Sequence, residues 1–248
     1  MVVALLVLIP VVAAAAIVVT AVKSGMVPNK LSMLVVCILG VLSFTIIDTM
    51  VQTAIDVENP PPTLVGFIGD SVISISDHES AVKFSEITGA ATIKAGIGGQ
   101  TSSQIAARFE YDIAVHRPSH AVLEGGINDN VWTNYSVKVP VLLGNFTYML
   151  GICQKYNIVP LVMLMTPYDS LSVANATLWN NANEELRELI THYYRAVCVD
   201  VRPNIGQAKV GGPPGNYWVW NPAYASDTIH PNFAGCDVIG TKLAASVP

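Results

Sequence analysis

Short apolar runs alternate with longer segments of helical periodicity from Leu64 to the end of the chain. Strands buried on both faces of a parallel sheet have this near-continuous hydrophobicity, and covering helices lie between them in sequence. The expected strands are residues 64–69, 92–97, 121–125, 159–165 and 197–201. The expected helices are residues 102–116, 139–156, 176–195 and 232–246. The pattern predicts a three-layer α/β/α domain built on a parallel sheet.

Two long runs without charged side chains precede this domain. Residues 1–22 are long enough to span a bilayer, and residues 31–47 form a second run near the lower length limit for a span. Together they predict a transmembrane helical hairpin within residues 1–55. One alternative is a cleaved signal peptide, although the first run has no basic segment before it. In another alternative, one run spans and the other packs on the membrane surface.

The charges around the two runs give the hairpin an orientation. Lys23 and Lys30 lie in the connecting loop, whereas the charged residues after the second run are all acidic (Asp48, Asp56 and Glu58). Loops rich in lysine and arginine stay on the cytoplasmic side, which predicts that both termini and the folded domain face away from the cytoplasm. Residues 56–63 contain three consecutive prolines and predict an extended linker to the domain at 64–248.

Four short motifs in the domain carry groups suited to acyl-transfer chemistry. Residues 69–71 read Gly-Asp-Ser at the end of the first expected strand, and Asp227 and His230 stand close together near the C-terminus. A serine hydroxyl is a weak nucleophile until an imidazole removes its proton and a carboxylate orients that imidazole. Between these motifs, residues 96–101 form a glycine-rich turn and residues 125–129 read Gly-Gly-Ile-Asn-Asp.

These motifs, in this order, resemble those of the SGNH hydrolases, also called GDSL-type esterases. By that resemblance Ser71 is the nucleophile, and Asp227 and His230 complete a catalytic triad. The backbone N–H groups of Ser71 and Gly99 and the side-chain amide of Asn128 would form the oxyanion hole. The resemblance implies a flavodoxin-like sheet and an ester-hydrolysing enzyme that needs no metal or organic cofactor.

The resemblance extends over residues 64–248, with one departure. Val72 stands where the family name has leucine, a change at an apolar packing position that leaves the chemistry untouched. Asp70 and Asp129 flank the functional positions, and we expect them to anchor their loops by hydrogen bonds. The remaining histidines have no partner pattern and are expected to be ordinary surface or half-buried residues (His78, His116, His120 and His192).

Other chemistries find little support in the sequence. Val72 and Ile73 follow Ser71, so the Gly-x-Ser-x-Gly elbow of the α/β-hydrolases is absent. The cysteines show no Cys-x-x-Cys pair, which argues against a zinc site. The chain has 13 Lys and Arg against 18 Asp and Glu without a basic cluster, so nucleic acid is not an expected partner. The domain's cysteines are expected to be buried thiols or to form at most one disulfide (Cys153, Cys198 and Cys236).

The substrate and the acyl acceptor stay open at this level. Trp132, Trp218 and Trp220 border the motifs, and flat rings beside an ester site suit stacking on sugars, which favours O-acetyl groups of a glycan. The same rings suit a lipid acyl-chain groove or plain packing. An acyl-enzyme can be resolved by water, as in an esterase, or by a sugar hydroxyl, as in an acetyltransferase. A non-catalytic anchored binding module would be favoured if a motif had lost its functional residue, and none has.

Overall fold

The computed structural model describes residues 63–74, 79–209 and 217–247. By its internal contacts the chain divides into two compact units, Met1–Pro60 and Pro61–Pro248, and all described residues belong to the second. The predicted hairpin at 1–55, the linker up to residue 62 and His78 lie outside the described residues.

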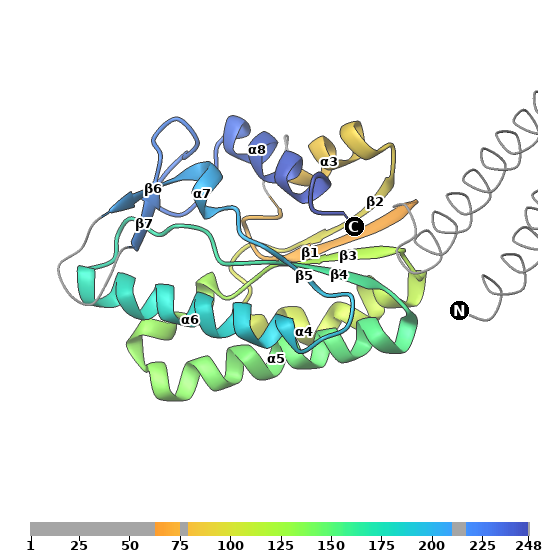
Figure 1. The fold of residues 1–248 in the computed structure, drawn as a ribbon, viewed down its shortest axis with the longest axis horizontal. Coiled ribbons are helices and arrows are strands. Elements are labelled where there is room, and N and C mark those ends of the chain that lie inside the picture. The colour runs from red at the N-terminus through yellow and green to blue at the C-terminus, as the bar shows by residue number, and fades with distance from the viewer. Residues whose placement is uncertain (1–62, 75–78, 210–216, 248) are drawn as a thin grey trace, which may run out of the picture. The chain divides into compact units, whose positions relative to one another are not determined.

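Five parallel strands form the central sheet, in the order β2-β1-β3-β4-β5 (Figure 1). Their bounds are β1 Leu64–Gly69, β2 Ala91–Gly96, β3 His120–Leu123, β4 Val159–Met163 and β5 Val197–Val199. The prediction of a five-stranded parallel sheet is confirmed, and the order is that of flavodoxin-like folds. Every residue of β3 and β4 is buried, which explains why these strands read as continuous apolar runs.

Helices cover both faces of the sheet (Figure 1). On one face lie α4 Ser102–Asp112, α5 Tyr135–Tyr156 and α6 Val173–Thr191, and on the other lie α3 Ser80–Thr88 and α8 Phe233–Ala244. Each face has its own apolar core, with Phe109 and Phe146 in the first and Phe84 and Leu243 in the second. The three-layer α/β/α architecture is therefore observed in the described part of the chain.

Several short elements were not predicted. Helix α3, the four-residue helix α7 Arg202–Ile205 and the antiparallel pair β6 Gly206–Lys209 and β7 Tyr217–Trp220 all lie between the predicted elements. Segments this short contain too few residues for a hydrophobic period to stand out. The β6–β7 pair forms a separate two-stranded sheet.

Helix α5 begins four residues earlier than predicted, at Tyr135 rather than at residue 139, and Pro140 lies inside it. Among the described helices, α5 has the length and apolar composition of a membrane span. It contributes the fully buried Met149 and Leu150 to the core beneath the sheet, so it is a core helix of this domain.

The structure decides the exposure of His120 and the bonding of the cysteines. The expectation of a surface or half-buried His120 is wrong, because this first residue of β3 is 0% exposed. Burial lowers the pKa of His120 to about 4, and the charge of Arg195 acts in the same direction. Cys153, Cys198 and Cys236 are free thiols, so the disulfide alternative is not realised in the structure.

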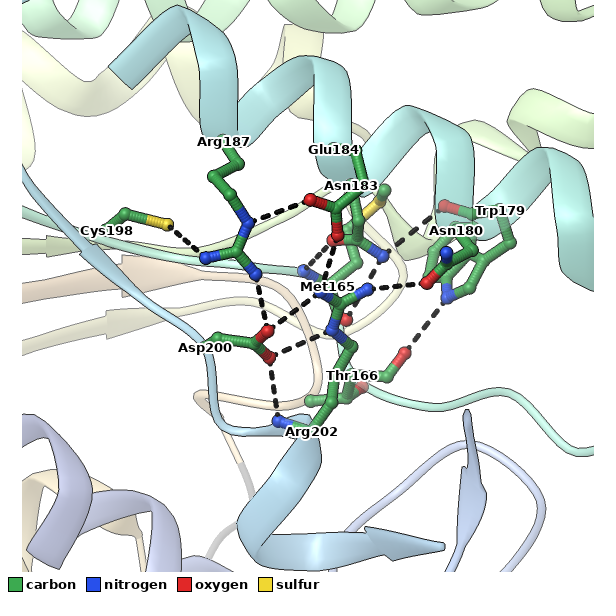
Figure 2. A network of polar contacts seen from close by, with 10 residues as sticks. All are labelled: Met165, Thr166, Trp179, Asn180, Asn183, Glu184, Arg187, Cys198, Asp200 and Arg202. Carbon is green, nitrogen blue, oxygen red and sulfur yellow. Dashed lines mark hydrogen bonds and ion pairs between the residues drawn. The ribbon is translucent and has the colours of Figure 1, made fainter. Parts of the chain in front are cut away.

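A polar network joins the carboxyl end of β5 to α6 (Figure 2). Arg202 is 3% exposed, and its guanidinium binds both oxygens of Asp200, with Nε–Oδ1 at 2.9 Å and Nη2–Oδ2 at 2.8 Å. It also donates to Glu184 and Asn180 on α6. Burial acts to raise the pKa of Asp200, but the hydrogen bonds and the charge of Arg202 outweigh burial and lower this pKa. The network fixes the start of α7 against α6.

Two further contacts in Figure 2 hold the segment that follows β4. Asn183 on α6 accepts the N–H of Met165 at 2.8 Å, and the indole N–H of Trp179 donates to the carbonyl of Thr166 at 3.1 Å. Both side chains are buried. The segment after β4 is therefore fixed where it approaches the C-terminal edge of the sheet.

Replacing Arg202 by alanine is expected to lower the free energy of unfolding by about 3 kcal/mol, because Asp200 loses its main partner in a largely buried site. For a domain of this size that corresponds to a fall in Tm of about 6–12 °C. Arg187→Ala is the matched control, since this side chain also binds Asp200 but is 39% exposed, and its loss should cost below about 1 kcal/mol. Thermal unfolding of the full-length protein, followed by tryptophan fluorescence, measures both; equal losses would contradict the assignment.

Candidate active site

The predicted site residues follow three neighbouring strands. Ser71 comes just after β1, Gly99 follows β2, and Asn128 lies in the short 3-10 helix Ile127–Asp129 beyond β3. Strand β1 pairs in parallel with both β2 and β3, so all three strands end at the same edge. Open α/β sheets bind ligands at this edge, where the strand order reverses.

A continuous chain of hydrogen bonds joins Ser71, His230 and Asp227. Ser71 Oγ lies 2.9 Å from His230 Nε2, and His230 Nδ1 lies 2.7 Å from Asp227 Oδ2. Ser71 and His230 are 159 positions apart in sequence, so the fold alone brings them together. With Nδ1–H donated to the carboxylate, the lone pair of Nε2 faces the hydroxyl, as a general base requires.

Asp227 is held by its own turn. Its Oδ1 accepts the N–H groups of Ile229 and His230, both at 2.7 Å. Although burial acts to raise it, the hydrogen bonds from the His230 ring and from these two N–H groups lower the pKa of Asp227. The carboxylate therefore stays ionised at neutral pH and can stabilise a positive charge on the imidazole.

Asp169, which the sequence analysis missed, supports the turn that carries Asp227 and His230. Its N–H donates to the carbonyl of Thr228 at 3.0 Å, and its Oδ1 accepts the N–H of Trp220 at 2.6 Å. Asp169 thus links the segment after β4 to β7 and to the C-terminal turn. Its position after a predicted strand, next to an aromatic residue, could have identified Asp169 as a candidate from the sequence.

The Gly98–Gly99 turn lies against the nucleophile. A Cβ atom at Gly98 would be 3.8 Å from the Cβ of Ser71. Gly99 has a φ of 77°, in the left-handed region, while the space around its Cβ position is open. Glycine is therefore required at position 99 by the backbone conformation and not by close packing. Gly99 is exposed, so its peptide is open to solvent.

The side-chain amide of Asn128 is held from two sides. Its Nδ2 donates to the carbonyl of Gln100 at 3.0 Å and to Oδ2 of Asp70 at 3.3 Å. Gln100 belongs to the turn after β2, and Asp70 is next to Ser71, so this amide connects the ends of three strands. The bond to Asp70 is the longer of the two.

Asp70 and Asp129 anchor their loops, as predicted. Asp70 accepts the N–H of Val72 at 3.0 Å, which closes the turn around Ser71. Asp129 accepts the N–H and the hydroxyl of Ser102 at 2.8 and 2.6 Å. Because Ser102 begins α4, this contact joins the Asn128 turn to a helix N-terminus, where a carboxylate is favoured.

The three tryptophans differ in exposure. Trp132 is half-buried, and its ring makes edge-to-face contacts with Tyr168 and Trp179 at centroid distances of 5.1 and 5.5 Å. Trp218 on β7 is half-buried. Trp220 is 2% exposed and packs in the core, so the expectation that its ring binds substrate is corrected. Trp218 and Trp220 lie two positions apart and therefore on the same face of β7, but only Trp220, the last residue of the strand, is buried.

Two hollows adjoin the site. One of about 350 Å³ lies beside His230, and the C-terminal turn and α8 line it (Ser226, Pro231, Asn232 and Phe233). The other, of about 490 Å³, follows the open edge of β2 against α4. Its apolar lining includes Ile97 and Tyr111, and Ile97 directly precedes the Gly98–Gly99 turn. Within the described residues, no cluster of three His, Cys, Asp or Glu side chains is arranged to hold a metal ion.

A Ser–His–Asp chain at the carboxyl edge of a flavodoxin-like sheet is the arrangement of an α/β serine hydrolase. The model of the GDSL-like lipase/acylhydrolase family matches residues 67–238. The chain therefore belongs to that family and is an esterase, in agreement with the resemblance of its four motifs. No curated protein gives a significant match to the sequence.

Solved structures of similar fold come from the same group of enzymes. A GDSL-like lipase from Bacteroides thetaiotaomicron has 20% identity and a TM-score of 0.60, covering 75% of this chain and 87% of its own. The acetyl xylan esterase AlAXEase has 20% identity and a TM-score of 0.57, covering 75% and 100%. An acetylxylan esterase from Geobacillus stearothermophilus has 14% identity and a TM-score of 0.57, covering 75% and 94%. At these identities the likeness concerns the fold.

Asn128→Ala is expected to reduce kcat for a small ester by about a hundredfold or more, the usual effect of removing one oxyanion donor. Ser71→Ala should abolish turnover, because it removes the hydroxyl that lies 2.9 Å from His230 Nε2. Asn181→Ala, at an exposed position of α6, is the control and should leave kcat unchanged. Steady-state hydrolysis of nitrophenyl acetate measures all three, and full activity of Asn128→Ala would refute its oxyanion role.

Proposed function

We propose that this enzyme cleaves carboxylic esters through an acyl-enzyme on Ser71. His230 Nε2 accepts the proton of the Ser71 hydroxyl as its oxygen attacks the ester carbonyl, and Asp227 stabilises the resulting imidazolium. When the tetrahedral intermediate collapses, the same proton passes to the leaving alcohol. The hydrogen-bonded chain from Ser71 Oγ to Asp227 is the observation that carries this proposal.

The oxyanion of the intermediate is assigned to three donors. These are the backbone N–H groups of Ser71 and Gly99 and the side-chain amide of Asn128. In the second half of the reaction, water takes the place of the alcohol. His230 removes a proton from this water, the hydroxide oxygen attacks the acyl carbon, and the proton returns to Ser71 as the acid departs.

For the substrate we propose O-acetyl groups on a glycan. Two observations support this choice: the similar fold of acetyl xylan esterases, and the half-buried Trp132 and Trp218, which follow Asn128 and precede Asp227 closely in sequence. Aromatic faces bind sugar rings through stacking. The rival substrate is a lipid or other long-acyl ester. Ile97 and Tyr111 in the hollow along β2 favour it, whereas the charged residues of the same hollow (Lys94, Arg108 and Asp112) do not.

Transfer of the acetyl group to a sugar hydroxyl is the alternative fate of the acyl-enzyme. We also propose that the domain faces away from the cytoplasm, held by the hairpin within residues 1–55. The support for this orientation is the pair of lysines, Lys23 and Lys30, between two uncharged runs.

A panel of nitrophenyl esters of graded chain length, tested on the full-length protein with Ser71→Ala as the blank, decides between the substrates. Acetate is expected to be the best of the series, and a clear preference for acyl chains beyond about eight carbons would favour the lipid rival.

Trp218→Ala should raise the KM for an acetylated oligosaccharide more than for nitrophenyl acetate, because a small ester has no sugar ring to stack. Equal effects on both would remove Trp218 from the substrate site. If an added glycan becomes acetylated and no free acetate is released, the enzyme transfers the acetyl group to a sugar hydroxyl instead of to water.

The orientation is tested with a membrane-impermeant thiol reagent on intact cells. Gly25→Cys should be shielded, whereas Tyr111→Cys, at a position that is 80% exposed in the domain, should be labelled. The parent protein, which has four cysteines of its own, gives the background. Labelling of Gly25→Cys alone would place the domain in the cytoplasm.

A further inference from the structure

Two carboxyl groups that the proposed chemistry does not use are buried together beneath the site. Asp70, between β1 and Ser71, is 0% exposed, and Glu124, directly after β3, is 1% exposed. The N–H of Asp70 donates to Oε2 of Glu124 at 3.0 Å, which brings the two buried side chains together. Two buried carboxyls in contact cannot both be ionised, because burial and mutual repulsion disfavour the second charge.

The fold makes room for this pair. Any side chain at Gly69 would collide with the carboxyl of Glu124 and with Ile73, so the glycine of the Gly-Asp-Ser motif permits the close approach. The backbone N–H of Glu124 donates to the carbonyl of Ile68 at 3.0 Å, which continues the pairing of β1 with β3. The carboxyl of Glu124 is therefore held in place by the sheet itself.

The surroundings of the two carboxyl groups are unequal. Asp70 accepts the N–H of Val72 and the amide of Asn128, and the charge of His230 favours its ionised form. Burial raises the pKa of Asp70 to about 6, and the N–H of Val72, the neighbouring Glu124 and the charge of His230 limit the rise. Burial raises the pKa of Glu124 well above its usual range, and the charges of Asp70 and Asp129 act in the same direction. Asp129 also faces Asp70 and directs its own oxygens to Ser102.

We propose that Glu124 stays protonated in the working enzyme and donates a hydrogen bond to Asp70, so that the pair holds one negative charge, located on Asp70. Glu124 and Asp70 are then positioning residues for the reaction proposed above. The charged Asp70 fixes the turn around Ser71 through Val72 and orients the amide of Asn128. Together with Asp227, it stabilises the positive charge that His230 acquires.

This division of roles has a consequence for pH dependence. Asp70 loses its charge as the pH falls through about 6, so the turn at Ser71 and the amide of Asn128 lose an ionised acceptor there. Activity should decline on the acid side in part because of Asp70. Glu124 remains neutral through the same range and contributes no titration of its own.

Substitutions that copy one protonation state test the assignment. Glu124→Gln keeps a donor and an acceptor without charge, so kcat for nitrophenyl acetate at pH 8 should stay within about threefold of the parent. Glu124→Leu removes both groups and should lose about tenfold or more in kcat. Asp70→Asn removes the charge and should also lose about tenfold in kcat, with little change in KM. Its kcat/KM should decline less steeply below about pH 6 than that of the parent.

The outcomes separate clearly. Loss in Glu124→Gln as large as in Asp70→Asn would overturn the proposal, because the charge would then be needed on Glu124. An Asp70→Asn variant with the parent's kcat and pH profile would also overturn it. Glu110→Gln is the control, since this half-buried carboxyl on α4 pairs with Lys155 and does not contact the site.

Infrared spectroscopy of the full-length protein gives a readout that does not depend on activity. At pH 8 the parent should show the C=O stretch of a protonated carboxylic acid, which Glu124→Gln loses and Glu110→Gln retains. Absence of this band from the parent would overturn the proposal even if the enzyme is an active esterase. A band that behaves as expected in a protein without ester turnover would instead refute the proposed function and leave the protonated Glu124 standing.

Discussion

The parallel pairing of β1 with β2 and β3 is the constraint on which the site depends. Because β1 lies between the other two strands and all three run in one direction, their carboxyl ends meet at one edge. The turns that carry Ser71, Gly99 and Asn128 are therefore neighbours in space although they are far apart in sequence. The amide of Asn128 joins the three turns by hydrogen bonds to Gln100 and Asp70.

The distribution of carboxyl groups around this edge follows their burial. Asp227 is exposed enough, and hydrogen-bonded enough, to remain an anion beside His230. Asp70 and Glu124 are both buried, and the N–H of Asp70 donates to Glu124, so a second charge on the pair is disfavoured. Asp129 is satisfied by Ser102 at the start of α4. Residues of the same chemical type therefore fill different roles, and solvent access and hydrogen bonding decide which role each one takes.

Much of the scaffold could be predicted from hydrophobic pattern. The five strands of the sheet and four of its covering helices have long, clear apolar periods, so their existence was evident even where their ends moved by a few residues. The short helix α3 and the β6–β7 pair gave no such signal, since their burial depends on neighbours distant in sequence. His120, which was expected to be a surface or half-buried residue, and Trp220, which was considered for substrate binding, show the same limit, because both are buried.

The sequence by itself determined the chemical groups of the site and their order, because the motifs around Ser71, Gly99, Asn128 and His230 are local and carry their own turn residues. It also determined the fold class, through apolar runs whose spacing suits a parallel sheet. Tertiary structure alone decided the pairing of Asp70 with Glu124, the support given by Asp169 and the burial of Trp220. These features arise between segments far apart in the chain, and burial, which sets protonation and exposure, exists only once those segments have packed.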